Sequence, residues 1–354
     1  MYALRGASAV LLVAALANEA HSFAQTLPAS PDLVSSMRFP DIFVSFNDEV
    51  IRRGCLYAAR ISKINANPDS TVEFRTIDLD CMSVLAGPEI HTVTVQYRTA
   101  AANSYSVIFP SARFLAPRNV SKDQMFLCVY QELSPLEKRR AVAQHQDDIT
   151  GTAYGLLPIA SADDPLIKVY EKVIAIRNAT TLEQRHALID EGLQQSHDDP
   201  LHDFCFLQIS QSAGTADEDW ALNILARWIP KAIRDQQHQK PAIGNPARSL
   251  LGRADKVTAC LEKIAASSTI PNNKLRALSL LLQWMALDDG VCAGHISHLP
   301  RFVENAPTSP RDLLSDDLRN VLIRRLATNP YILPSQREDQ KKISTWLSAV
   351  QQYP

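Results

Sequence analysis

The stretch HTVTVQYR at residues 91–98 decides how the first third of the chain folds. Val93, Val95 and Tyr97 alternate with polar residues, and this period of two places them on one face of a β-strand. Apolar or alternating runs flank it, and we expect further strands at 50–64, 72–85, 104–109 and 125–130. About five strands in roughly 95 residues are typical of a small closed or nearly closed β-barrel.

The strands at 50–64 and 72–85 are joined by a turn-rich run that contains Pro68. A hairpin centred near Pro68 places Cys55 opposite Cys81, because the two cysteines are equally far from the turn. A disulfide between them is therefore a candidate. Two buried free thiols are the alternative, since a slip of one residue would turn the cysteines to opposite faces. Cys128 is another possible partner.

The order of these segments resembles a known type of barrel. The sequence EVIRRGC at 49–55 begins a strand, VLAGP follows at 84–88, and the closing strand is at 125–130. This order is similar to the OB-type barrel of netrin-like and tissue-inhibitor-like modules, and of many uncharacterised bacterial exported proteins. The resemblance covers residues 45–131. It implies an OB-like fold for this part of an exported protein.

The chain also departs from that family. Ala86 stands where the family often has lysine. In the inhibitors, a cysteine at the mature N-terminus ligates the zinc of a protease, whereas this chain has Gln25 at the corresponding place. The resemblance therefore does not imply protease inhibition by that mechanism.

After residue 133 the apolar period becomes that of α-helices. Helix starts recur as an aspartate, threonine or serine followed by proline or an acid, as in Asp164-Pro165 and Asp199-Pro200. About ten amphipathic helices with short connections predict a HEAT-like or TPR-like repeat layer, or an irregular bundle. We therefore expect an α+β protein with an OB-like barrel domain at 37–133, a linker with one helix at 134–163, and an all-helical domain at 164–351.

The N-terminus has the pattern of a secretory signal peptide at residues 1–24. Arg5 is followed by an apolar run at 7–17, and Ser22-Phe23-Ala24 places small residues before a cleavage site at Gln25. The apolar run is shorter than the about 20 residues that span a bilayer. An uncleaved anchor or N-terminal helix is the alternative. We expect a secreted or periplasmic protein with no integral membrane segment after cleavage.

The composition disfavours several classes of protein. With 36 Lys and Arg against 38 Asp and Glu, the net charge is −2, so a generic binder of nucleic acid or anionic membranes is not expected. Only 11 residues are glycine, and no GxSxG, HExxH, SxxK, Walker or GxGxxG motif occurs. We expect no cofactor, and no catalytic residue can be assigned. A binding or scaffold protein that uses its helical domain for protein partners is the leading hypothesis.

Two histidine clusters could carry chemistry. His197, Asp199, His202 and Asp203 are weak metal candidates, and His197 and His202 are the first suspects if the protein is instead a hydrolase. The start of a helix at Asp199-Pro200 explains the same residues without any ligand. His295 and His298 are spaced to share one helix face and could hold zinc weakly, but the sequence places no further ligand nearby.

Overall fold

The computed structural model describes residues 39–65, 74–98, 120–143, 148–238, 244–286, 288–304 and 310–348. Contacts divide the chain into two units, 1–39 and 40–354, and every described residue except Phe39 belongs to the second. The predicted signal peptide at 1–24 and the predicted strand at 104–109 lie outside the described residues.

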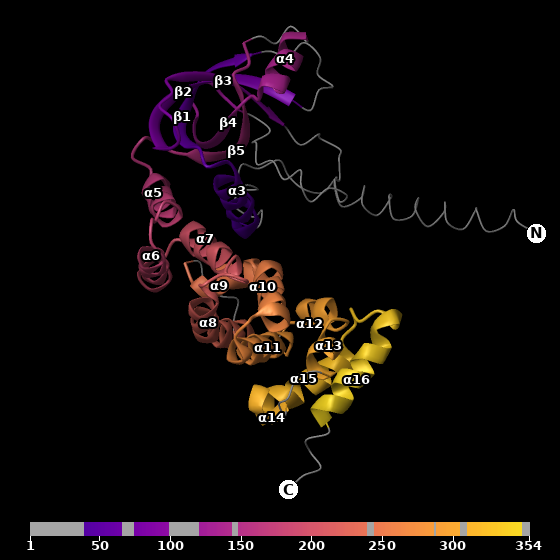
Figure 1. The fold of residues 1–354 in the computed structure, drawn as a ribbon. Helices are drawn as coiled ribbons and strands as arrows, with labels where there is room; N and C mark the ends of the chain where they lie inside the picture. Colours follow the sequence, from indigo (N-terminus) through magenta and orange to yellow (C-terminus); the bar gives the residue numbers. More distant parts are fainter. Residues whose placement is uncertain are drawn as a thin grey trace, which may run out of the picture. The chain divides into compact units, whose positions relative to one another are not determined.

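The described part has a β-rich segment followed by helices, so the expected α+β class is confirmed (Figure 1). The first segment contains α3 (Phe39–Arg53), β1 (Leu56–Asn65), β2 (Phe74–Ala86), β3 (Thr92–Arg98), β4 (Met125–Glu132), α4 (Pro135–Ala143) and β5 (Gly151–Ile159). The helices that follow are α5 (Pro165–Arg177), α6 (Leu182–Gln195), α7 (Asp199–Ser210), α8 (Glu218–His238), α9 (Pro246–Gly252), α10 (Ala254–Ser267), α11 (Pro271–Met285), α12 (Asp289–His295), α13 (Leu299–Glu304), α14 (Pro310–Leu313), α15 (Asp316–Thr328), the 3₁₀ turn η1 (Pro334–Gln336) and α16 (Arg337–Ser348).

Residues 50–53 form the end of α3, so the prediction that a strand begins at residue 50 is wrong. Phe46 and Val50 are four residues apart and both are buried, which is the spacing of one helix face. Gly54 ends the helix with a φ of +81°, a conformation that favours glycine, and its N–H donates to the carbonyl of Val50. The strand starts only at Leu56.

The strands pair in the order β1-β2-β3-β5-β4, and β4 pairs back onto β1. Most neighbours are antiparallel, whereas β3 and β5 are parallel and share only two residue pairs. The predicted β1–β2 register is wrong, because Cys81 lies opposite Ala59 and Cys55 precedes the strand. Three register shifts between the two strands displace the pairing from that of a regular hairpin.

Strand β5 occupies a segment that the sequence led us to assign to a linker with one helix. That helix is α4, and β5 then returns to the sheet beside β4. Its glycines make room for aromatic rings: a Cβ added at Gly155 would lie 2.8 Å from Cδ2 of Phe46. The sheet therefore continues to Ile159, beyond the predicted boundary at residue 133.

The strands divide their side chains between two apolar clusters by the period of two. Tyr57, Ala59, Phe126 and Cys128 belong to a cluster whose buried members all lie in the strands. Leu56, Ala58, Leu127 and Val129 belong to the cluster that continues through α3 and the helices. The outward face of these strands is thus covered by helical side chains, and one apolar core joins sheet and helices.

Helices α5 to α16 pack on their neighbours. Helix α10 contacts α7 and α11, α11 also contacts α8, and α16 contacts α13 and α15. Several helices begin with the expected cap: Asp164 accepts from the N–H of Leu166, and Ser315 from that of Leu318. Within the described ranges, none of the helices has the length and apolar character that crossing a membrane requires.

Candidate functional site

The predicted cluster at residues 197–203 lies at the start of α7, where its side chains turn to separate partners. His197 is exposed, whereas His202 is buried and its Nε2 lies 3.0 Å from the carbonyl oxygen of Ser196. Asp199 accepts a hydrogen bond of 2.8 Å from the backbone N–H of Gly244. Burial lowers the pKa of His202, which favours the neutral ring. The helix start thus separates the side chains that the sequence places together.

Asp203, the fourth member of that cluster, belongs to a buried polar network. Arg253 donates from Nε and Nη2 to its two carboxylate oxygens, each at 2.7 Å. Asn47 of α3 donates to Oδ2 of Asp203 at 2.8 Å and to the carbonyl of Pro200 at 2.9 Å. The hydroxyl of Tyr170 donates to Oδ1 of Asn47 at 3.0 Å. One asparagine therefore ties α3 to both α5 and α7.

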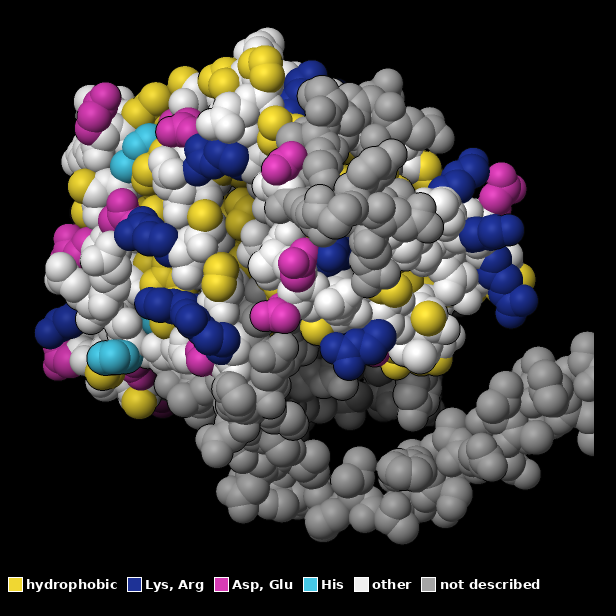
Figure 2. Space-filling model, turned by 90° about the horizontal axis from the view of Figure 1, so that it is seen from below, with side chains coloured by type: hydrophobic (Ala, Val, Ile, Leu, Met, Phe, Trp, Pro, Cys, Tyr) yellow, Lys and Arg dark blue, Asp and Glu magenta, His cyan; other side chains and the backbone are white. Residues whose placement is uncertain are grey.

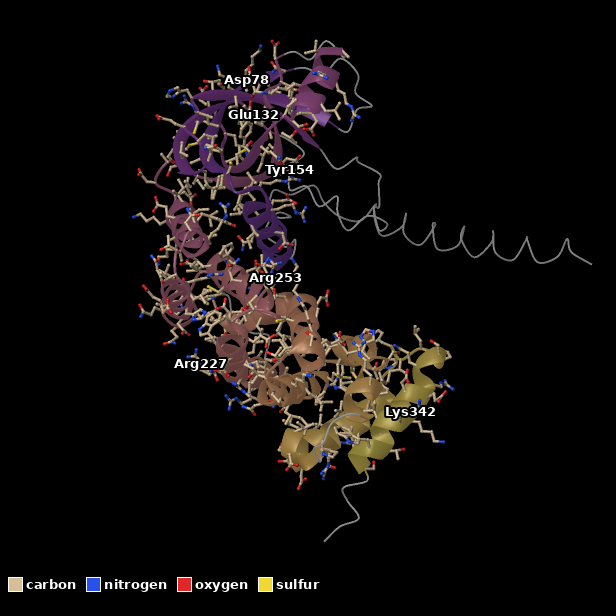
Figure 3. The ribbon with its side chains drawn as sticks, viewed as in Figure 1. Asp78, Glu132, Tyr154, Arg227, Arg253 and Lys342 are labelled. Atoms are coloured by element: carbon tan, nitrogen blue, oxygen red, sulfur yellow. The ribbon has the colours of Figure 1, made fainter. Side chains whose placement is uncertain are left out.

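Arg253 lies where α9 meets α10, opposite α3 (Figure 3). Its Nη1 donates to Oδ1 of Asp48 at 2.7 Å, and the ammonium of Lys256 reaches the same carboxylate at 2.9 Å. The side chain of Arg253 is 1% exposed and that of Asp203 is 5% exposed. Burial raises the pKa of the Asp203 carboxyl, and the guanidinium of Arg253 opposes that shift by stabilising the carboxylate. These contacts hold a buried charge pair in a fixed geometry.

No local pattern in the sequence indicates that Asp203 belongs to such a network. Asp203 and Arg253 are 50 positions apart, and Asp48 precedes Arg253 by 205 positions. Arg253 stands between Gly252 and Ala254, and these neighbours do not indicate whether its side chain is buried. The packing of α7 against α9 and α10 brings Asp203 to Arg253, and α3 supplies Asp48.

A second group combines thiols and a tyrosine at one end of the sheet. The hydroxyl of Tyr57 donates to the carbonyl of Pro88 at 3.1 Å, and Cys55 lies beside the same ring. Burial raises the pKa of Tyr57, and it raises the pKa of the Cys128 thiol to about 12. Cys55 and Cys81 are half-buried and carry free thiols in the structure. The disulfide between them stays a prediction.

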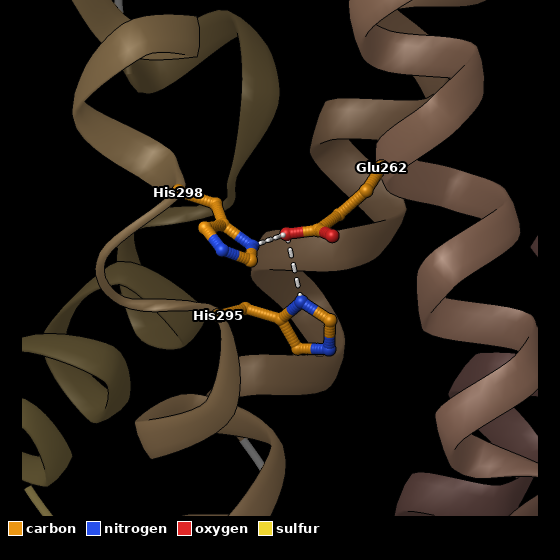
Figure 4. A group of neighbouring side chains, drawn as sticks. All are labelled: Glu262, His295 and His298. Atoms are coloured by element: carbon orange, nitrogen blue, oxygen red, sulfur yellow. Dashed lines mark hydrogen bonds and ion pairs between the residues drawn. The ribbon is translucent and has the colours of Figure 1, made fainter.

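A third group contains the other predicted histidine pair. His295 is the last residue of α12, and His298 lies in the turn before α13, so the two do not share one helix face. Both direct Nδ1 toward Glu262 of α10 (Figure 4). Oε1 of Glu262 lies 2.8 Å from Nδ1 of His295 and 2.9 Å from Nδ1 of His298. Among the described residues, these three bring metal-ligating atoms within 4.8 Å of one another.

Comparison of the chain with protein-family models, with curated proteins and with solved structures found no match.

Proposed function

We propose that the protein is an exported, non-catalytic binding or scaffold protein whose helical part recognises a protein partner. The observation that carries the proposal is that the buried side chains of the cluster at 197–203 are engaged in contacts within the protein. Its buried members make internal contacts, His202 with Ser196 and Asp203 with Arg253. Such side chains are held for stability, and they are not presented to a substrate.

The Tyr331–Leu333 link, between α15 and η1, exposes apolar side chains on a backbone that hydrogen bonds hold in place. Tyr331 and Leu333 are 65% and 59% exposed, while Ile332 between them packs against the core. The amides of Asn329 and Gln336 hold the two ends of this link by donating to the carbonyls of Asp289 and Ala293. An exposed aromatic side chain on a fixed backbone loses little entropy on binding, which favours its use at a protein interface.

The charge pattern also supports a protein partner. Figure 2 shows one face of the molecule, on which Lys and Arg side chains lie among acidic and apolar ones. A polyanion would favour a continuous basic surface, whereas mixed charges suit the polar rim of a protein interface. We therefore propose no nucleic-acid partner.

An OB-type barrel and a HEAT-like or TPR-like helical layer belong to the same proposal. The strand order β1-β2-β3-β5-β4, with a parallel β3–β5 contact, supports the OB-type assignment. The succession of short packed helices from α5 to α16 supports a helical layer that presents an extended surface.

The test is site-specific photocrosslinking in the cells that produce the protein. A photoreactive phenylalanine analogue at Tyr331 should give a discrete adduct, and Leu333→Asp should remove it because the charge disrupts the apolar contact. The analogue at Leu136 of α4, which is 58% exposed, is the matched control. The proposal fails if position 331 gives no adduct, or if both positions give the same set.

A hydrolase site at His197 and His202 remains the competing function. Ester, phosphate, peptide and glycoside substrates are assayed with the wild-type protein and with His197→Ala and His202→Ala. Activity that both substitutions abolish, in variants that keep the wild-type circular dichroism spectrum, would favour the hydrolase over the binding protein.

A further inference from the structure

We propose that Glu262, His295 and His298 form a binding site for a divalent transition-metal ion such as Zn²⁺. The ion would take one carboxylate oxygen and two imidazole nitrogens from the protein, and a water molecule or a partner's donor would complete its coordination. This inference is independent of the proposed function, because none of the three residues belongs to the Tyr331–Leu333 link or to the cluster at 197–203.

The distances suit a small rearrangement around an ion. Tetrahedral zinc with bonds of 2.0–2.2 Å holds its ligand atoms about 3.4 Å apart. The three candidate ligand atoms already lie within 4.8 Å of one another, and Oε1 of Glu262 is 2.8 and 2.9 Å from the two nitrogens. Outward movement of the carboxylate by a fraction of an ångström would make room for an ion between the three ligand atoms.

The carboxylate of Glu262 does not satisfy Nδ1 of His295, which indicates that a further ligand binds there. Its Nδ1 is buried and lies at ion-pair distance from Glu262, yet no hydrogen bond is aligned with it. His298, by contrast, makes a hydrogen bond of 2.9 Å to the same oxygen. A buried nitrogen without an aligned hydrogen bond costs free energy, and a metal bond along its lone pair would remove that cost.

The backbone around the site is held by the core. Ile296 and Leu299, which directly follow His295 and His298, are fully buried, and Leu261 is fully buried beside Glu262. The side chains of Glu262 and His295 are 14% and 15% exposed, so they are held in place before any ion arrives. Preorganised ligands of this kind lose little freedom on binding, which raises affinity.

The donor set selects the class of ion. Two imidazoles and one carboxylate suit Zn²⁺ and its neighbours in the first transition row, whereas Ca²⁺ and Mg²⁺ prefer sites made of oxygen ligands. The side chain of His298 is 50% exposed, so solvent reaches the site from its side. Three protein ligands with an accessible fourth position distinguish an open site from a closed structural one.

The experiment uses the full-length protein, with any affinity tag removed and metal stripped by a chelator that is then dialysed away. Co²⁺ is titrated first, because the intensity of its visible absorption reports four-coordinate geometry, and Zn²⁺ is then titrated by calorimetry. We expect one ion of either metal per chain, and Zn²⁺ should displace Co²⁺ and bleach the absorption.

Three variants identify the ligands. Glu262→Gln and His295→Gln should each weaken Zn²⁺ binding at least tenfold, since even the loss of an outer-shell partner costs about 10–100-fold. The double variant His295→Gln/His298→Gln should lose the cobalt absorption. His197→Gln is the matched control, because it removes an exposed histidine from the other predicted cluster and should bind Zn²⁺ as the wild type does.

Circular dichroism in chelator establishes that each variant is folded, and the shift of thermal midpoint on adding Zn²⁺ provides a second readout that should vanish in the double variant. Absence of Zn²⁺ and Co²⁺ binding by the wild type would overturn the inference. So would undiminished binding by a folded Glu262→Gln or double variant, which would place the ion elsewhere.

Discussion

Arg253 donates two hydrogen bonds of 2.7 Å to the carboxylate of Asp203, one from Nε and one from Nη2. The guanidinium also donates to Asp48 of α3, so a single side chain joins the first described helix to α7 at the junction of α9 and α10. Because the pair is almost fully buried, its charges depend on each other for solvation.

Replacing Arg253 with methionine should destabilise the protein by about 3–5 kcal/mol, because the change leaves the Asp203 carboxylate buried without its partner. Lys256→Met is the matched control. Lys256 bonds the neighbouring Asp48, but its side chain is 45% exposed, and its loss should cost less than about 1 kcal/mol. Urea unfolding measures both changes, and equal losses would contradict the special role of Arg253.

Gly87 should not tolerate a side chain. Its φ is +111°, and an added Cβ would lie 2.6 Å from the Tyr57 hydroxyl. Gly87→Val should therefore destabilise the protein by about 2–4 kcal/mol through backbone strain and overpacking. Gly252→Ala in α9 is the control, because a Cβ there meets no atom within 4 Å, and it should stabilise by about 0.4–1 kcal/mol. A tolerated valine at residue 87 would refute the packing described around Tyr57.

The cysteines should differ in reactivity after reduction. Cys55 and Cys81 are half-buried, whereas the other four are buried, and burial raises the pKa of both Cys260 and Cys292 to about 11. Brief alkylation of the native reduced protein, followed by peptide mapping, should label the first two and leave the remainder until unfolding. Rapid labelling of the buried thiols would argue against their packing.

The predicted disulfide and signal cleavage can be tested together by intact mass. The exported protein should begin at Gln25, and alkylation without reduction should modify neither Cys55 nor Cys81 if the two are joined. A chain that begins at Met1, or one in which both thiols are alkylated before reduction, would remove the corresponding prediction.

Stability should fall as the pH drops below about 6.5, partly because of His202. Burial lowers the pKa of this ring in the folded state, so the unfolded chain binds a proton that the folded chain does not. The contribution of His202 is therefore fully present above the unfolded pKa and is lost as the pH falls toward the folded value, by at most about 1.4 kcal/mol per pH unit.

The variant His202→Gln isolates this contribution. Unfolding in urea at about pH 7.5 and pH 5.5, on either side of the unfolded pKa, should show a larger loss for the wild type than for the variant. Equal losses in the two proteins would mean that His202 is protonated as readily when folded as when unfolded.

The sequence predicted the elements whose pattern is local. Val93 and Val95 mark β3 by alternation, and Asp164-Pro165 marks the start of α5 by its cap. It failed at residues 50–53, where the β-branched pair Val50-Ile51 favoured a strand although the burial of Phe46 and Val50 follows a helix. The predicted register of β1 and β2 is wrong because of β-bulges between the two strands. The position of a bulge is set by packing across strands and not by the hairpin sequence.

The candidate sites show the same division. Density of ligand-type residues singled out 197–203, but a helix start spreads those side chains in different directions. The His295 and His298 pair was visible in the sequence, whereas its third member, Glu262, stands 36 positions before His298 on another helix. Tertiary packing brings Glu262 to the two histidines, and the spacing of residues in the sequence does not predict this contact.

The long-range contacts of α3 also bear on the order in which parts of the protein fold. Its Asn47 and Asp48 form hydrogen bonds with residues between 123 and 208 positions further along the chain. The polar contacts of α3 are therefore complete only when the chain as far as Lys256 is available. Closing so long a loop is slow, since its entropy cost precedes any contact. Phe46 of the same helix packs beside Gly155 and Tyr170, which are nearer in sequence, so the apolar contacts of α3 can form before its polar contacts are complete.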